Sequence, residues 1–128
     1  LNKFKVTSVL TSALYFYLFI SLLLFPESLC NGFGVEGNES VYFLARRTST
    51  LMLGFSVLVF LLRNTPPSVA RQAVAFSIGL NMAGFALLGA FESIRGFVTT
   101  SILGVIVIEV LIAAIYFSFW VTDRRHYR

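Results

Sequence analysis

The sequence has almost none of the side chains that bind metal ions or form covalent crosslinks. There is one cysteine, Cys30, and one histidine, His126. An internal disulfide is therefore impossible, and neither a haem held by two histidines nor a His/Cys metal cage can be built. We also find no nucleophile–base pair and no glycine-rich phosphate loop. The sequence thus predicts a protein that is not an enzyme and that holds no metal and no cofactor.

Charged residues are scarce as well. They make up 12% of the 128 residues, whereas 57% are hydrophobic, and a soluble domain usually has about 25% charged residues. A soluble domain of this length could not bury so much apolar surface, but a lipid bilayer would solvate it. The net charge of +4 does not indicate nucleic acid, because the basic residues form no stripe or run. The expected partner is therefore the lipid bilayer.

Four apolar stretches have the length of about 20 residues that is needed to cross a bilayer. They cover residues 4–25, 41–62, 70–91 and 97–121. Backbone groups in lipid must be paired internally, so each stretch is predicted to be a helix. Short connections place consecutive helices side by side in opposite directions. We expect an all-α, single membrane domain over residues 1–128, an integral bundle of four antiparallel transmembrane helices in up-down-up-down order.

The ends of these stretches carry local signals. Lys3 and Lys5 before the first apolar run resemble a signal peptide, but the run is too long and no A-x-A site follows it, so we expect a retained helix. Residues 26–40 are predicted to be the longest connection, with Asn38 or Ser40 capping the second helix. Thr65 is predicted to cap the third helix, with a proline at the first helical position.

The basic residues predict the orientation of the chain in the membrane. One end of the bundle would carry Lys3, Lys5, Arg63, Arg71, Arg124, Arg125 and Arg128. The other end would carry Arg46, Arg47 and Arg95. Because Lys and Arg collect on the cytoplasmic side, seven against three predicts that both termini are cytoplasmic.

Glu109 lies about halfway along the fourth apolar stretch. An acidic residue at the bilayer centre costs roughly 2.5 to 3.5 kcal/mol on insertion scales, so its side chain must face protein or water. It is either a proton, cation or ligand site, or a neutral acid that joins helices. In the second case Asn81, at a similar depth on the third stretch, is the expected hydrogen-bond partner. Tyr116 lies seven residues further on, on the same helix face, and could add a hydroxyl group.

A second set of charges, Arg46, Arg47, Glu92 and Arg95, is expected at the opposite end from the termini. Arg46 and Arg47, one to two turns inside the second predicted helix, can reach the lipid headgroups. Alternatively, one of them pairs with Glu92 and marks a polar vestibule. Glu92 and Arg95 can also pair with each other at helical spacing, which would contribute little stability.

The third stretch is rich in small residues that allow close helix packing. Gly79, Ala83, Gly84, Ala86 and Ala90 include pairs at small-xxx-small spacing. This pattern predicts a helix at the centre of the bundle or in an oligomer interface. Ordinary packing within one chain is the alternative.

Four short segments carry a family resemblance: LARR at 44–47, LG at 53–54, RNTP at 63–66 and ARQA at 70–73. In these segments the chain resembles small, mostly uncharacterised four-helix proteins of the bacterial inner membrane that are loosely DoxX-like. The resemblance implies a bacterial inner-membrane location and the four-helix topology, but no activity. In size the chain is also similar to small multidrug-resistance transporters, but their essential glutamate is in the first helix, where this chain has no acid.

The sequence leaves two main functions open, and an enzyme acting on lipid or quinone is a distant third. The first, which the sequence favours, is a non-enzymatic membrane module that self-associates or joins a membrane partner protein, with the third helix and Glu109 organising its core. The second is a small transporter or channel in which Glu109 binds a proton or cation. A water-accessible route to an essential Glu109 would favour the transporter.

Overall fold

The computed structural model describes residues 2–126, without the side chain of His126, and folds them into five helices and no strand. The helices are α1 (Lys3–Leu24), α2 (Pro26–Phe33), α3 (Glu39–Leu61), α4 (Val69–Ile94) and α5 (Ile102–His126). Within the described residues, α1, α3, α4 and α5 are long and apolar enough to cross a membrane. The prediction of an all-α protein is confirmed, as is the prediction of four helices long and apolar enough to span a membrane.

Side-chain caps fix where α3 and α4 begin. The Asn38 side chain accepts a hydrogen bond of 3.0 Å from the backbone N–H of Val41, as predicted for α3. The cap of α4 is Ser68, which accepts from the backbone N–H of Arg71 at 3.1 Å. The prediction of Thr65 as this cap is wrong. Its backbone N–H instead closes the turn that follows α3.

Helix α2 lies in a segment that was predicted to be a connecting loop. Pro26 takes the first helical position and Glu27 the first turn, both favourable at a helix N-terminus. Gly34, with φ of 69°, ends the helix in the left-handed conformation that glycine adopts easily. Eight residues are too few to span a bilayer, so this helix adds no further crossing.

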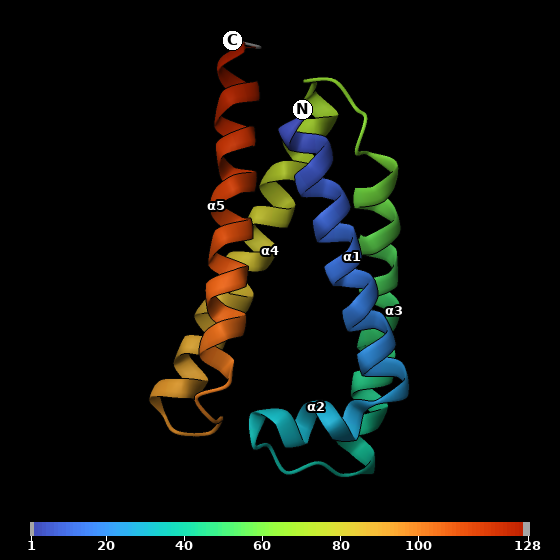
Figure 1. Ribbon diagram of the computed structural model, residues 1–128, viewed down its shortest axis with the longest axis vertical. Coiled ribbons are helices and arrows are strands. Elements are labelled where there is room, and N and C mark those ends of the chain that lie inside the picture. Colours follow the sequence, from blue (N-terminus) through green and yellow to red (C-terminus); the bar gives the residue numbers. More distant parts are fainter. Residues whose placement is uncertain (1, 127–128) are drawn as a thin grey trace.

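Hydrogen bonds join α2 to the connection between α4 and α5. The backbone N–H of Thr99 donates to the carbonyl of Phe33 at 2.9 Å, and the Ser101 hydroxyl donates to the carbonyl of Gly32 at 2.6 Å. This connection therefore extends to residue 101, and α5 begins at Ile102 rather than at the predicted residue 97. Figure 1 shows α2 lying across the end of the molecule that is opposite to both termini.

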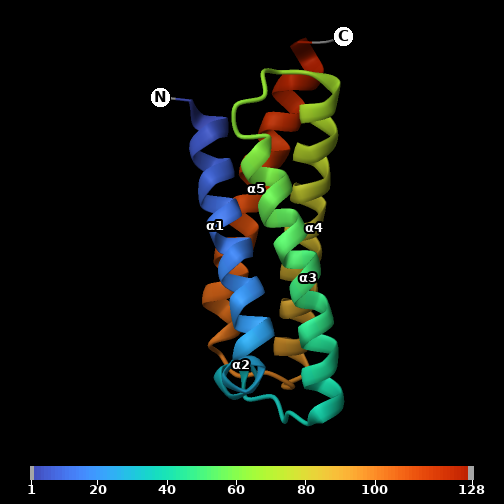
Figure 2. The ribbon, with the colours of Figure 1, turned by 90° about the vertical axis from the view of Figure 1, so that its right-hand side faces the viewer.

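The four long helices form two pairs. Helix α1 packs mainly against α3, and α4 packs mainly against α5; we call them the first pair and the second pair. The pairs approach each other near the termini and diverge toward α2 (Figure 1), and the side view shows the long helices roughly aligned (Figure 2). The predicted central position of α4 is not found, because α4 is paired with α5.

Small residues allow close packing inside each pair. In the first pair, the Ser12 hydroxyl donates to the carbonyl of Ser56, and the Ser56 hydroxyl donates back to the carbonyl of Ser12, each at 2.8 Å. In the second pair, Gly79 lies under the Phe117 ring, and a Cβ atom there would be 2.9 Å from ring atoms Cδ1 and Cε1. Of the predicted packing residues, Gly84 has nothing within 4 Å of such a Cβ.

Candidate functional site

Polar side chains gather where the first pair faces the second pair. We call this surface the seam and define it by Ser8 and Tyr15 of α1, Asn81 of α4, and Glu109 and Tyr116 of α5. Tyr15 and Tyr116 are both 0% exposed. Tyrosine and asparagine at such a depth need partners, because an unpaired polar group in an apolar environment is costly.

Two hydrogen bonds cross the seam. The Asn81 amide nitrogen Nδ2 donates to the Tyr15 hydroxyl at 2.7 Å. The Tyr116 hydroxyl donates to the Ser8 hydroxyl at 3.3 Å. The Thr11 hydroxyl is buried beside that of Tyr116, without the geometry of a hydrogen bond. Both bonds connect α1 to the second pair, so they hold the pairs in register.

Glu109 is buried in the seam, with 9% of its surface exposed. It lies within electrostatic range of the Tyr15 hydroxyl, but its carboxyl group forms no hydrogen bond or ion pair with any described residue. The predicted hydrogen bond between Asn81 and Glu109 is wrong, because the Asn81 amide is directed to Tyr15. The Tyr116 hydroxyl is likewise directed to Ser8.

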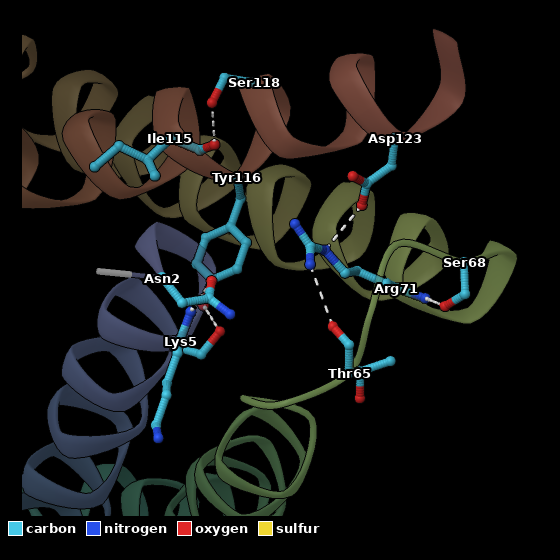
Figure 3. A network of polar contacts seen from close by, with 10 residues as sticks. Asn2, Lys5, Thr65, Ser68, Arg71, Ile115, Tyr116, Ser118 and Asp123 are labelled. Atoms are coloured by element: carbon cyan, nitrogen blue, oxygen red, sulfur yellow. Dashed lines mark hydrogen bonds and ion pairs between the residues drawn. The ribbon is translucent and has the colours of Figure 1, made fainter. Parts of the chain in front are cut away.

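A buried ion pair lies at the terminal end of the seam (Figure 3). Arg71 Nε of α4 is 2.9 Å from Asp123 Oδ2 of α5, and these side chains are only 11% and 2% exposed. The contact is an ion pair without hydrogen-bond alignment. Arg71 also donates from Nη1 to the carbonyl of Thr65 at 3.2 Å, and its guanidinium stacks 4.0 Å from the centre of the Phe4 ring.

Sequence reasoning missed this pair. It counted Arg71 as a topology-setting charge and did not consider Asp123. A signal was present, because Arg71 is near the start of α4 and Asp123 is near the end of α5. Neighbouring helices of opposite direction place these two positions at the same level, and an acid beside an apolar segment needs a partner there.

The predicted charge cluster at the other end does not come together. Glu92 and Arg95 pair with each other through Oε2 and Nε at 2.6 Å, and their side chains are 31% and 53% exposed. Arg46 and Arg47 are exposed and form no ion pair among the described residues. The pairing of Glu92 with an arginine of α3 is therefore wrong, and no polar vestibule forms from these four side chains.

An apolar groove of about 500 Å³ lies between α4 and α5 of the second pair. Small side chains from both helices line it, among them Ala83, Ala86, Ala90, Ala113 and Ala114. Three of these residues belong to the predicted packing set of α4. The groove is separate from the seam, because its lining contains no seam residue.

These features define an integral membrane protein that crosses the bilayer several times. Large apolar side chains cover the outside, with Leu10, Leu61 and Leu87 more than 60% exposed, whereas polar groups line the inside. Comparisons with protein-family models, with curated proteins and with solved structures found no match to this chain.

Proposed function

We propose that this protein is a small, non-enzymatic transporter or channel in which Glu109 binds a proton or a monovalent cation. The supporting observation is that Glu109 is buried in the seam without a partner among the described residues. A carboxyl group that served only to join helices would form a hydrogen bond across them. Asn81, the residue best placed by depth to accept that role, is bound to Tyr15.

The chemistry around Glu109 favours a small, hard cation. The Glu109 carboxylate offers two oxygen atoms, and oxygen ligands suit protons and hard cations. The described residues contain no group of three His, Cys, Asp or Glu side chains close enough to share a metal ion. A single carboxylate balances one positive charge, which fits a proton or a monovalent ion.

The proposal includes a topology. Four antiparallel helices would cross the bacterial inner membrane in up-down-up-down order, with both termini in the cytoplasm. Its support is the excess of Lys and Arg at the end where both termini lie. Helix α2 would then rest at the outer surface of the membrane.

A transport assay tests the role of Glu109. Purified protein would be reconstituted in liposomes, and influx of protons, Na⁺ and K⁺ would be followed in separate experiments with a trapped pH dye and with radioactive tracers. We expect one of the three to enter faster than into empty liposomes and Glu109→Gln to abolish that flux. Glu92→Gln is the matched control, because Glu92 is exposed and paired outside the seam. Equal flux for Glu109→Gln and the unmodified protein, or no flux above empty liposomes, would contradict the proposal.

A second candidate function is that of a subunit in a membrane assembly, formed with further copies or with a partner protein. The observation that favours it is the groove of small residues on the second pair, since small side chains let another helix approach closely. Native mass measurement in lipid nanodiscs tests it. A monomeric mass at every protein concentration would exclude self-association.

A further inference from the structure

The terminal end of the seam is closed by a compact layer of side chains. Phe4 of α1 is 2% exposed and stands edge-on to Tyr116 and Phe119 of α5, with ring centres 6.3 Å and 5.3 Å apart. Arg71 covers the other face of this layer, 4.0 Å from the Phe4 ring centre. Ser8 lies one helical turn below Phe4, so this layer separates the polar groups of the seam from the terminal end.

Three segments converge on Arg71. Its guanidinium contacts Phe4 of the first pair, Asp123 of the second pair, and the carbonyl of Thr65 in the α3–α4 connection. Arg71 is therefore the residue through which the first pair, the second pair and the connection between them meet. Moving the pairs apart at this end requires the stacking contact with Phe4 to break.

The Arg71–Asp123 ion pair determines how strongly the layer is held closed. A buried ion pair that loses one partner leaves an uncompensated charge in an apolar environment, which is strongly unfavourable. Asp123 thus holds Arg71 in place over Phe4. The Arg71–Asp123 contact lacks hydrogen-bond alignment, and both residues lie near the ends of their helices.

We propose that Arg71, Asp123 and Phe4 form a gate at the terminal end of the seam, closed in this structure, that controls access of ions and water to Glu109. The inference rests on the proposed transport function, which gives the gate its purpose. The Phe4 ring blocks the passage. Arg71 stacks on this ring and so connects the second pair to the first pair, and Asp123 is the positioning residue that keeps Arg71 over the ring.

Chemical labelling tests the gate without any measurement of flux. The reporter is Thr11→Cys in a Cys30→Ser background, because the Thr11 hydroxyl is buried two helical turns beyond Phe4 and lacks the geometry of a hydrogen bond. Protein in lipid nanodiscs would react with a charged maleimide. We expect slow labelling with the gate intact, and labelling at least tenfold faster with Asp123→Asn or with Phe4→Ala. The control Glu92→Gln should leave the rate unchanged.

A second reporter separates gate opening from general loosening. Ser49→Cys in the same background lies on α3 and is 0% exposed, away from Phe4. Faster labelling of position 11 alone supports the gate. Unchanged labelling at position 11, or equally faster labelling at both positions, overturns it. Loss of flux in Glu109→Gln bears on the transport proposal separately, because the labelling rates do not depend on Glu109.

Discussion

The amide nitrogen of Asn81 lies 2.7 Å from the Tyr15 hydroxyl and donates a hydrogen bond to it. Asn81 is near the middle of α4 and Tyr15 is near the middle of α1. The bond therefore joins the two helix pairs about halfway along their length. Its strength should set how firmly the pairs are held together.

We predict that Asn81→Ala and Tyr15→Phe each lower the free energy of unfolding, because each leaves one polar group of the bond unpaired. Interhelical hydrogen bonds in membranes contribute about 0.6 to 2 kcal/mol. A double-mutant cycle, measured by unfolding in mixed micelles, should give a coupling energy in this range.

The control for this cycle is Ser77→Ala. Ser77 is also on α4, but its hydroxyl is exposed and bonds only to the carbonyl of Ala73 in its own helix. Its combination with Tyr15→Phe should be additive. A zero coupling energy between positions 81 and 15 would mean that the bond does not hold the pairs together.

Two glycines of α4 should respond in opposite ways to alanine. At Gly79 the added methyl group would lie 2.9 Å from the Phe117 ring, so Gly79→Ala forces a repacking that costs about 1 to 3 kcal/mol. At Gly84 the methyl group meets nothing within 4 Å, and alanine favours the helix by up to about 1 kcal/mol. Thermal denaturation in detergent should therefore rank Gly84→Ala above the unmodified protein and Gly79→Ala below it. The reverse ranking would contradict the packing of α4 on α5.

The reciprocal bonds between Ser12 and Ser56 should make the first pair sensitive to side-chain size. Ser56→Ala keeps the small volume and loses hydrogen bonds, so we expect a loss of about 1 kcal/mol. Ser56→Leu also prevents the close approach of α1 and α3 and should destabilise the protein further. Thr48→Leu serves as the control, because Thr48 is exposed on the same helix. Similar unfolding midpoints for Ser56→Leu and Thr48→Leu would contradict this packing.

The proposed orientation predicts which cysteines a membrane-impermeant maleimide can reach. Cys30 lies in α2, opposite to both termini, so it should be labelled from outside intact cells. Asn64→Cys in a Cys30→Ser background lies in the connection near the termini and should be labelled only after lysis. The opposite result for both cysteines would invert the topology.

Much of the fold could be predicted from apolar length alone. In lipid, a stretch of about 20 apolar residues pairs its backbone groups by forming a helix. Asn38 is a strong helix cap. The predicted helix boundaries were wrong where contacts with other parts of the chain determine them. Helix α5 starts late because Thr99 and Ser101 bind α2, and the eight-residue α2 has no long periodic pattern that would reveal it.

The candidate site was predicted only in part. Glu109 and Asn81 were identified because polar residues at membrane depth are costly. Their pairing was wrong, because depth along a helix does not determine which face a side chain occupies. The seam partner of Asn81 is Tyr15, which is 66 residues away in sequence and belongs to α1. The Arg71–Asp123 pair was missed because residues near the ends of apolar stretches were taken as topology signals.

The division into two helix pairs has a consequence for biosynthesis. Most of the packing of α1 is with α3 and most of the packing of α4 is with α5, so the first pair has its main contacts in the chain before α4 is made. Each pair can therefore enter the bilayer and condense as a unit, and the polar contacts between Tyr15 and Asn81 form last. We therefore expect a chain divided in the α3–α4 connection to assemble from two separately synthesised fragments, with the two pairs docking after each has formed.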